Sequence, residues 1–172
     1  MSDDEIFHQA LTRYERPLIS YAKSITGDWD SAKDAVQETF LRLSRENLKN
    51  LEPRLAAWLF AVCRTRAIDY RRKVVRFVSS EDGNLESTPA ESLEPHAQMA
   101  QAEDRAQLSE LIARLPEKQR EVVKLKFEAG LSYREISDVT KHSIGNVGFL
   151  LHTAIQTLRR QWNQTTHLPT LS

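Results

Sequence analysis

The chain has 172 residues, and its 24 Lys and Arg residues balance 24 Asp and Glu residues. With 40% hydrophobic and 28% charged residues, the composition is that of a globular protein and excludes a disordered acidic chain. One cysteine, Cys63, excludes a disulfide framework and a Cys-rich zinc site. No apolar run approaches the roughly 20 residues of a membrane span, and the acidic N-terminus does not resemble a signal peptide. We therefore expect a helical, cytoplasmic protein without a cofactor or a metal.

The first part of the chain, residues 1–77, is predicted to form a bundle of three or four helices. Apolar residues recur at helical spacing up to Gly27, which is predicted to end the first helix. Ser31 is predicted to cap the second helix, and Pro53 stands where another helix begins. Cys63 falls within the apolar stripe of that later helix, which favours a role as a small buried hydrophobic residue.

Charge is distributed unevenly along the chain. Between Val62 and Arg76 the chain has one acid, Asp69, and the cations Arg64, Arg66, Arg71, Arg72, Lys73 and Arg76. Cations beside Trp58 and Tyr70 suit single-stranded DNA, because rings stack on bases while cations hold phosphates; a solvated helix face is the alternative. Residues 79–104 contain no Lys or Arg. Within that stretch, residues 78–98 are predicted to be a flexible acidic linker, since little apolar surface is available for folding.

Residues 99–162 are predicted to form a second helical domain. Ser132 and Glu135 have the spacing of a capping box, and after a tight turn Ser143 is predicted to cap the final helix. A short helix, a tight turn and a longer helix form the helix-turn-helix pattern, whose second helix enters the DNA major groove. The last residues, 163–172, are predicted to be a mobile tail. The predicted fold is therefore all-α, with two small helical domains joined by a flexible acidic linker and a helix-turn-helix in the second domain.

Three motifs follow one another at a distinctive spacing. They are DAVQETFLRL at residues 34–43, AWLFAVCRTRAIDYRR at 57–72, and LPEKQREVV from 115, followed by GLSYREI at 130–136. Together they resemble bacterial RNA polymerase sigma factors of the extracytoplasmic-function (ECF) group. The resemblance implies a transcription initiation factor, not an enzyme, that binds core RNA polymerase and promoter DNA. It also implies that the first domain binds the polymerase clamp helices and melts the −10 element. The second domain would read the −35 element and touch the polymerase flap.

The resemblance, together with the basic and aromatic character of the second motif and its neighbourhood, assigns residues to three surfaces. The polymerase-binding residues are Asp34, Gln37, Glu38, Phe40 and Leu41, of which Phe40 and Leu41 match the packing side of that helix. The −10 DNA-binding residues are Trp58, Arg64, Thr65, Asp69, Arg71, Arg72 and Lys73. The −35 DNA-binding residues are Tyr133, Arg134, Ser143, Asn146, Gly148, Phe149 and His152. An ion pair between Asp69 and Arg66 or Arg72 is the alternative role for Asp69, and Thr65 stands where the family usually has Asn.

The sequence departs from the family pattern before the first motif. Ser31 and Lys33 stand where the family commonly has acidic residues. Phosphorylation of Ser31 by a kinase would restore about −1.5 to −2 charges there, which gives the hypothesis that polymerase binding depends on this modification. The alternative is that Ser31 is an N-cap and that the neighbouring acids Asp28 and Asp30 supply the charge.

The final helix is a second departure, because residues 143–158 contain no Lys or Arg. Phosphate contacts made by cations release counterions, so their absence predicts weak −35 binding with a shallow salt dependence. The alternative function is a regulatory or adaptor protein whose face around Phe149 binds a protein such as an anti-sigma factor. A repressor that does not recruit polymerase would not need the 34–43 motif. A nuclease would need a metal-binding carboxylate cluster or an activated nucleophile, and the sequence has neither motif.

Overall fold

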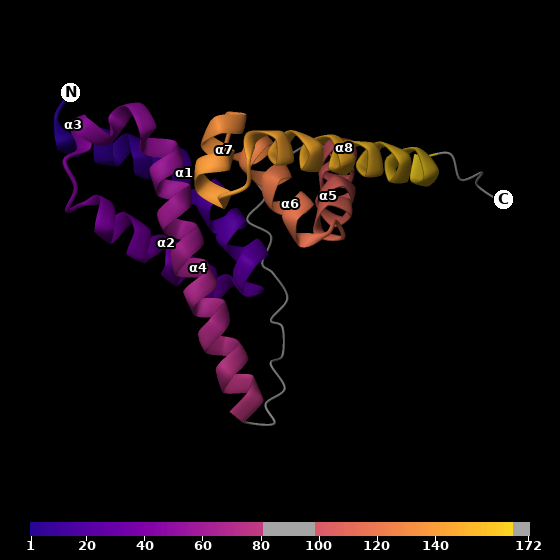
Figure 1. Cartoon of the computed structure of the whole chain (residues 1–172), viewed down its shortest axis with the longest axis horizontal. Coiled ribbons are helices and arrows are strands. Elements are labelled where there is room, and N and C mark those ends of the chain that lie inside the picture. Colours follow the sequence, from indigo (N-terminus) through magenta and orange to yellow (C-terminus); the bar gives the residue numbers. More distant parts are fainter. Residues whose placement is uncertain (81–98, 167–172) are drawn as a thin grey trace.

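The computed structural model describes residues 1–80 and 99–166, and within these ranges the chain is all-α as predicted (Figure 1). The first domain consists of α1 (Asp3–Thr26), α2 (Trp29–Leu43), α3 (Leu48–Leu51), the 3₁₀ turn η1 (Glu52–Arg54) and α4 (Leu55–Ser80). The second consists of α5 (Met99–Ala113), α6 (Glu117–Val123), the π-helical turn η2 (Lys124–Glu128), α7 (Tyr133–Thr140) and α8 (Ile144–Thr166). No helix of the described residues is long and apolar enough to cross a membrane.

The first domain is a bundle in which α1, α2 and α4 pack against one another. A capping box between Ser2 and Glu5 starts α1, and Gly27 ends it as predicted, with a left-handed φ of 87°. The α1–α4 contact contains Tyr21 and Phe60, whose rings meet edge to face with centroids 5.5 Å apart. Both rings are almost completely buried. These aromatic contacts fix α4, the helix that carries the basic motif, against the rest of the bundle.

The prediction that Ser31 caps α2 is wrong. The N-cap is Asp28, whose carboxylate accepts a hydrogen bond of 2.8 Å from the backbone N–H of Ser31. Because the left-handed Gly27 ends α1 immediately before it, Asp28 takes the extended conformation of an N-cap and α2 begins three residues earlier than predicted. Ser31 therefore lies in the first turn of α2. Pro53 lies in η1 and precedes α4 as expected, whereas the short helix α3 before it was not predicted.

The helix-turn-helix of the second domain follows the sequence prediction. Ser132 and Glu135 form both hydrogen bonds of the capping box that starts α7. Lys141, with φ of 68°, ends α7. The hydroxyl of Ser143 then accepts a hydrogen bond of 3.1 Å from the N–H of Asn146 at the start of α8. These local signals lie within a few residues of the boundaries they set, which is why the sequence reveals them.

Two domain boundaries differ from the prediction. Helix α4 continues to Ser80, so residues 78–80 of the expected linker are helical. Helix α8 continues to Thr166, so residues 163–166 of the expected tail are helical. No glycine directly follows either helix end. The remainder of the predicted linker, 81–98, and of the predicted tail, 167–172, lies outside the described residues.

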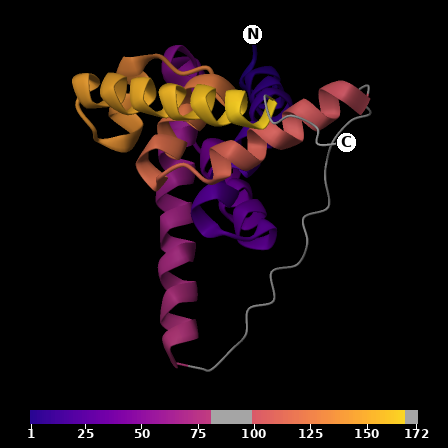
Figure 2. The same cartoon turned by 90° about the vertical axis from the view of Figure 1, so that its right-hand side faces the viewer.

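The two domains pack directly against each other. Helix α7 lies on α4, and η2 contacts α1. Most buried hydrophobic residues of both domains belong to one cluster, which includes Leu18 and Phe60 of the first domain and Leu125 and Ile136 of the second. The distal half of α4 projects away from this core, as both ribbon views show (Figures 1 and 2). This arrangement leaves one end of the basic helix exposed and covers the other.

Candidate nucleic-acid interface

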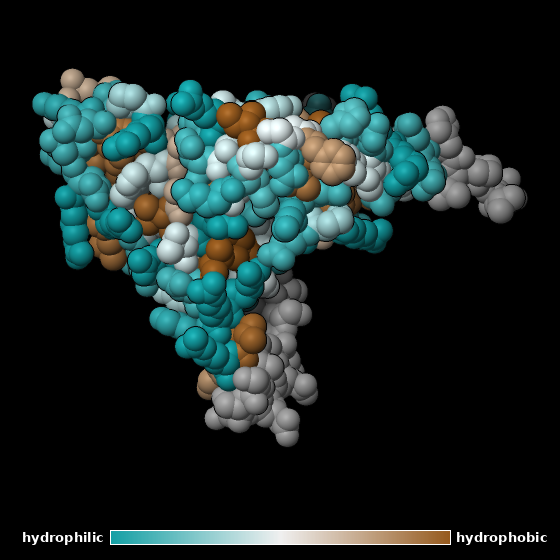
Figure 3. All heavy atoms as spheres, viewed as in Figure 1, coloured by the Kyte–Doolittle hydropathy of each residue, from teal (hydrophilic) through white to brown (hydrophobic). Residues whose placement is uncertain are grey.

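The distal half of α4 is a basic arm. Arg72, Lys73, Val75 and Arg76 are exposed there. Apolar atoms reach the surface of the same part of α4 beside hydrophilic ones (Figure 3). Because cations and apolar surface occur together, this arm can contact both the phosphates and the bases of a separated DNA strand.

A cleft of about 280 Å³ opens where the arm passes α2. Its lining residues are Glu38 of α2 and Arg66, Asp69, Tyr70, Arg72, Lys73 and Arg76 of α4. The Tyr70 hydroxyl donates a 2.6 Å hydrogen bond to Glu38, and this bond raises the pKa of Tyr70 to about 12. The Lys73 ammonium lies 5.6 Å from the centre of the Tyr70 ring. The cleft therefore combines an oriented aromatic ring with several cations.

Asp69 forms an ion pair with Arg66 one turn earlier on the same helix. The closest nitrogen and oxygen are 3.9 Å apart, and both side chains are about two-fifths exposed. An exposed pair at this separation adds little stability. Asp69 therefore pairs with Arg66, as its alternative role predicts. The pair is weak enough for either side chain to turn toward a ligand.

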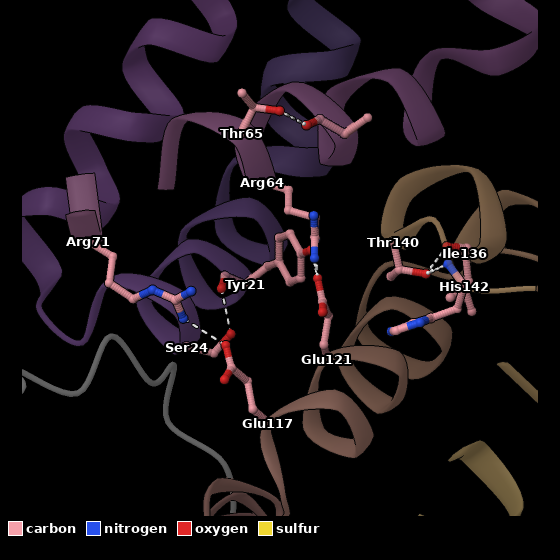
Figure 4. A network of polar contacts seen from close by, with 11 residues as sticks. Tyr21, Ser24, Arg64, Thr65, Arg71, Glu117, Glu121, Ile136, Thr140 and His142 are labelled. Carbon is pink, nitrogen blue, oxygen red and sulfur yellow. Dashed lines mark hydrogen bonds and ion pairs between the residues drawn. The ribbon is translucent and has the colours of Figure 1, made fainter. Parts of the chain in front are cut away.

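Two other arginines of the −10 motif, Arg64 and Arg71, point toward the second domain (Figure 4). The Arg64 Nε donates to Glu121 Oε1 over 2.6 Å, and the Tyr21 hydroxyl donates to the same oxygen over 2.7 Å. Arg71 donates to Glu117 over 2.7 Å. Sequence analysis gave no signal for these contacts, because the partners are 57 and 46 residues apart along the chain.

The electrostatics of these contacts follow from their burial and pairing. Burial opposes the charge of Arg64, but its bond to Glu121 outweighs this effect and the pKa of Arg64 is raised. Burial and Glu121 together raise the pKa of Tyr21 well above its ordinary value, so Tyr21 remains a neutral donor. The Arg71 hydrogen bond lowers the pKa of Glu117. Each group is thus held in the protonation state that the contact requires.

The two remaining residues of the predicted −10 set lie on the part of α4 nearest the bundle. Trp58 is half-buried, and the Arg42 guanidinium lies 5.8 Å from its ring centre. Thr65 is exposed, and its hydroxyl donates to the Ala61 carbonyl over 3.2 Å. The predicted −10 residues are therefore divided between the bundle, the exposed arm and the contact with the second domain.

The predicted polymerase-binding residues divide according to their position on α2. Asp34, Gln37, Glu38 and Leu41 are exposed and share one face, because they are spaced at i, i+3, i+4 and i+7. The prediction that Leu41 lies on the packing side is wrong, because Leu41 shares the outward face of α2 and is 54% exposed, which is unusual for a leucine beside a well-packed core. Phe40 instead is buried and packs edge to face on Phe7, so it supports the helix from behind.

The helix-turn-helix presents an aromatic face. Tyr133, Arg134, Asn146, Phe149 and His152 are exposed, with Phe149 66% exposed. Gly148 lies next to the Tyr133 ring, since a Cβ at this position would be 3.6 Å from the ring. Lys126 of η2, which no sequence motif indicated, has its ammonium 5.3 Å from the centre of the Tyr133 ring. Lys126 therefore brings a cation to a face whose own helix has none between residues 143 and 158.

Comparisons with known proteins agree with this geometry. The Sigma-70 region 2 family model matches residues 10–77, and the Sigma-70, region 4 model matches residues 105–158. The chain is 30% identical over 164 residues to the ECF RNA polymerase sigma factor SigM of Bacillus subtilis, covering 95% of this chain and 97% of SigM. It is 34% identical over 147 residues to the ECF RNA polymerase sigma factor SigL of Mycobacterium tuberculosis, covering 83% of this chain and 80% of SigL.

Two solved structures have a similar fold. The sigma factor RpoE of Bartonella quintana, in complex with the anti-sigma factor NepR, superposes with a TM-score of 0.69 at 24% identity and covers 91% of this chain and 96% of RpoE. CnrH, in complex with the cytosolic domain of CnrY, superposes with a TM-score of 0.60 at 20% identity, covering 92% of this chain and 88% of CnrH. At these identities the two structures establish the fold alone.

Proposed function

Since the chain belongs to the ECF RNA polymerase sigma factors, which bind core RNA polymerase and direct it to promoters, we propose how its surfaces divide that work. The exposed face of α2 binds polymerase, the arm of α4 holds the melted −10 strand, and the helix-turn-helix reads the −35 element and touches the flap. The protein acts in the cytoplasm and catalyses no reaction of its own. The observation that carries this proposal is the position of the basic cleft directly beside the exposed face of α2.

Asp34, Gln37, Glu38 and Leu41 form the surface that contacts the clamp helices. Their support is the shared exposed face on α2, in which Glu38 and Asp34 lie one and two turns before the exposed Leu41. An exposed apolar residue beside polar groups can anchor an interface. Phe40 contributes by packing on Phe7 and holding this face in position.

The cleft along α4 holds a nucleotide of the separated strand. Tyr70 offers a ring for stacking, and Arg72 and Lys73 supply phosphate contacts. The hydrogen bond between Tyr70 and Glu38 links this cleft to the polymerase-binding face. Polymerase binding and strand capture thereby use adjacent groups on two packed helices.

The face around Tyr133, Asn146 and Phe149 reads the −35 element. Asn146 suits an adenine edge and Phe149 suits a thymine methyl group, while Lys126 and Arg134 supply the phosphate contacts that α8 lacks. The exposure of Phe149 also favours a second candidate, in which this face binds a protein such as an anti-sigma factor. A protein that binds core polymerase but does not protect the −35 element in a footprint would support the second candidate over the first.

Transcription with purified core polymerase tests the proposal, with promoters taken from the DNA surrounding the gene. The expected result is a run-off transcript and permanganate-reactive thymines near position −10. An Arg72→Ala/Lys73→Ala variant should retain polymerase binding and lose most permanganate reactivity, because the altered residues are exposed cations of the arm. The assignment would be overturned if the unmodified protein and the Ser31→Asp variant both failed to co-elute with polymerase and both left the thymines unreactive.

A further inference from the structure

Glu38 of α2 lies at the border of two surfaces. It shares the exposed face of α2 with Asp34, Gln37 and Leu41, the residues proposed to bind polymerase. Within the described residues, Glu38 is also the one member of α2 that lines the basic cleft along α4. Its carboxylate therefore contacts the proposed DNA surface as well as belonging to the proposed polymerase surface.

The Tyr70 side chain is held at both of its ends. Its hydroxyl donates to Glu38 Oε1 over 2.6 Å, a short bond to a charged acceptor. Its ring is half-buried and packs against the hydrophobic core. A tyrosine side chain turns about only two torsion angles, so contacts at both ends leave it little freedom. Tyr70 is therefore held in one orientation at the wall of the cleft.

The cations of the cleft suit a ring that is held in this way. The Lys73 ammonium lies 5.6 Å from the centre of the Tyr70 ring, and the preceding residue, Arg72, is exposed. A base that stacks on the ring would bring its phosphate close to these side chains. A ring whose orientation is already fixed loses less conformational entropy when it binds a base. Loss of the Glu38 bond would release the hydroxyl end of the ring and increase this entropy loss.

We propose that Glu38 is a positioning residue for DNA, which holds Tyr70 in the orientation in which a base of the separated strand stacks on the ring. The inference rests on the proposed function for the identity of the ligand. It gives Glu38 a role besides polymerase binding. One carboxylate oxygen, Oε1, accepts the Tyr70 bond, and the second oxygen of a carboxylate can accept from another partner. Glu38 thus serves both surfaces.

The contact itself is tested in the full chain without DNA or polymerase. Carbon-13 at the tyrosine ζ position reports ionisation by NMR, and the Tyr70 signal is the one missing from Tyr70→Phe. In the unmodified protein Tyr70 should remain neutral at about pH 10.5, because its pKa is about 12. In Glu38→Ala it should be substantially ionised at the same pH, because its pKa falls toward the ordinary value of 10.0. Circular dichroism at that pH verifies that each protein is folded.

Asp34→Ala is the matched control for this titration. It removes an equal charge from the same exposed face of α2, one turn before Glu38. It leaves the Tyr70 hydrogen bond in place, so Tyr70 should titrate almost as in the unmodified protein. Equal titration of Tyr70 in Glu38→Ala and in the unmodified protein would overturn the proposal.

Permanganate reactivity of the −10 thymines then tests the effect on DNA, with each variant at a concentration that saturates core polymerase. Saturation separates a defect in strand capture from weaker polymerase binding. Tyr70→Phe and Glu38→Ala should each lower the reactivity about fivefold, the effect of one lost hydrogen bond. Glu38→Gln should lose less, because its amide oxygen still accepts from Tyr70.

A double-mutant cycle shows whether Glu38 acts through Tyr70. Glu38→Ala should cause no further loss in the Tyr70→Phe background, whereas Asp34→Ala should have the same effect in both backgrounds. An equal loss from Glu38→Ala in both backgrounds, or full reactivity of Tyr70→Phe, would overturn the proposal. If the unmodified holoenzyme also left the thymines unreactive, the proposed function would fail and the positioning role with it.

Discussion

At the residue scale, Lys141 occupies a conformation that disfavours a side chain. Its φ of 68° lies in the left-handed region, at the end of α7 in the turn of the helix-turn-helix. A glycine takes this conformation without steric cost. We expect Lys141→Gly to raise the free energy of unfolding by about 0.5–1 kcal/mol, measured by urea denaturation. Lys141→Ala serves as the control, and an equal gain there would assign the effect to charge instead of to the backbone.

Cys63 is a second residue whose properties follow from its burial. It is fully buried, and burial raises the pKa of its thiol from 9.0 to about 12. The native protein should therefore resist a thiol reagent that reacts at once after unfolding. Because the unfolded thiol ionises first as the pH rises from 9 toward 12, its contribution to the free energy of unfolding is fully present below pH 9 and is lost across this interval. The free energy of unfolding of a Cys63→Ala variant should therefore fall less between pH 9 and pH 12 than that of the unmodified protein. An identical pH dependence of the two proteins would contradict this prediction.

Ser31 lies in the first turn of α2, and its hydroxyl is not needed for the cap that Asp28 provides. A negative charge at a helix N-terminus is favourable. If phosphorylation supplies the charge that polymerase binding requires, Ser31→Asp should bind core polymerase more tightly than Ser31→Ala, measured by fluorescence titration. Equal affinities would show that Asp28 and Asp30 are sufficient.

At the element scale, α2 has separate supporting and binding faces. Leu41 is exposed while Phe40 beside it is buried. We expect Leu41→Ala to leave the free energy of unfolding within about 0.5 kcal/mol and to weaken core polymerase binding at least about fivefold, as for an interface residue worth about 1 kcal/mol. Val75→Ala, another exposed apolar truncation, is the matched control for co-elution with core polymerase. Equal losses in the two variants would contradict a specific role for Leu41.

Helix α8 departs from the usual chemistry of a DNA-reading helix. It offers aromatic and amide groups and no cations between residues 143 and 158. Binding of the −35 element should therefore depend only weakly on salt. Phe149→Lys should steepen the slope of log affinity against log salt by about 0.9, the value for one added phosphate contact, whereas Phe149→Ala should weaken binding without changing the slope. A steep slope in the unmodified protein would show that other cations dominate.

At the scale of the whole molecule, two domains that the sequence separates share one buried cluster. In this packing Arg64 and Arg71 of the first domain donate hydrogen bonds to Glu121 and Glu117 of the second. These partners are brought together by the fold and not by neighbouring residues in the sequence.

The sequence by itself determined the long helices, most of their ends and the family, because these depend on residues within a few positions of one another. The helical spacing of apolar residues, Gly27, and the Ser132 capping box are such local signals. Tertiary structure decided that Leu41 is exposed and that Lys126 joins the aromatic face. It also decided the partners of Arg64 and Arg71. Side chains 57 and 46 residues apart meet only when the packing of all helices is fixed, and no local pattern encodes that meeting.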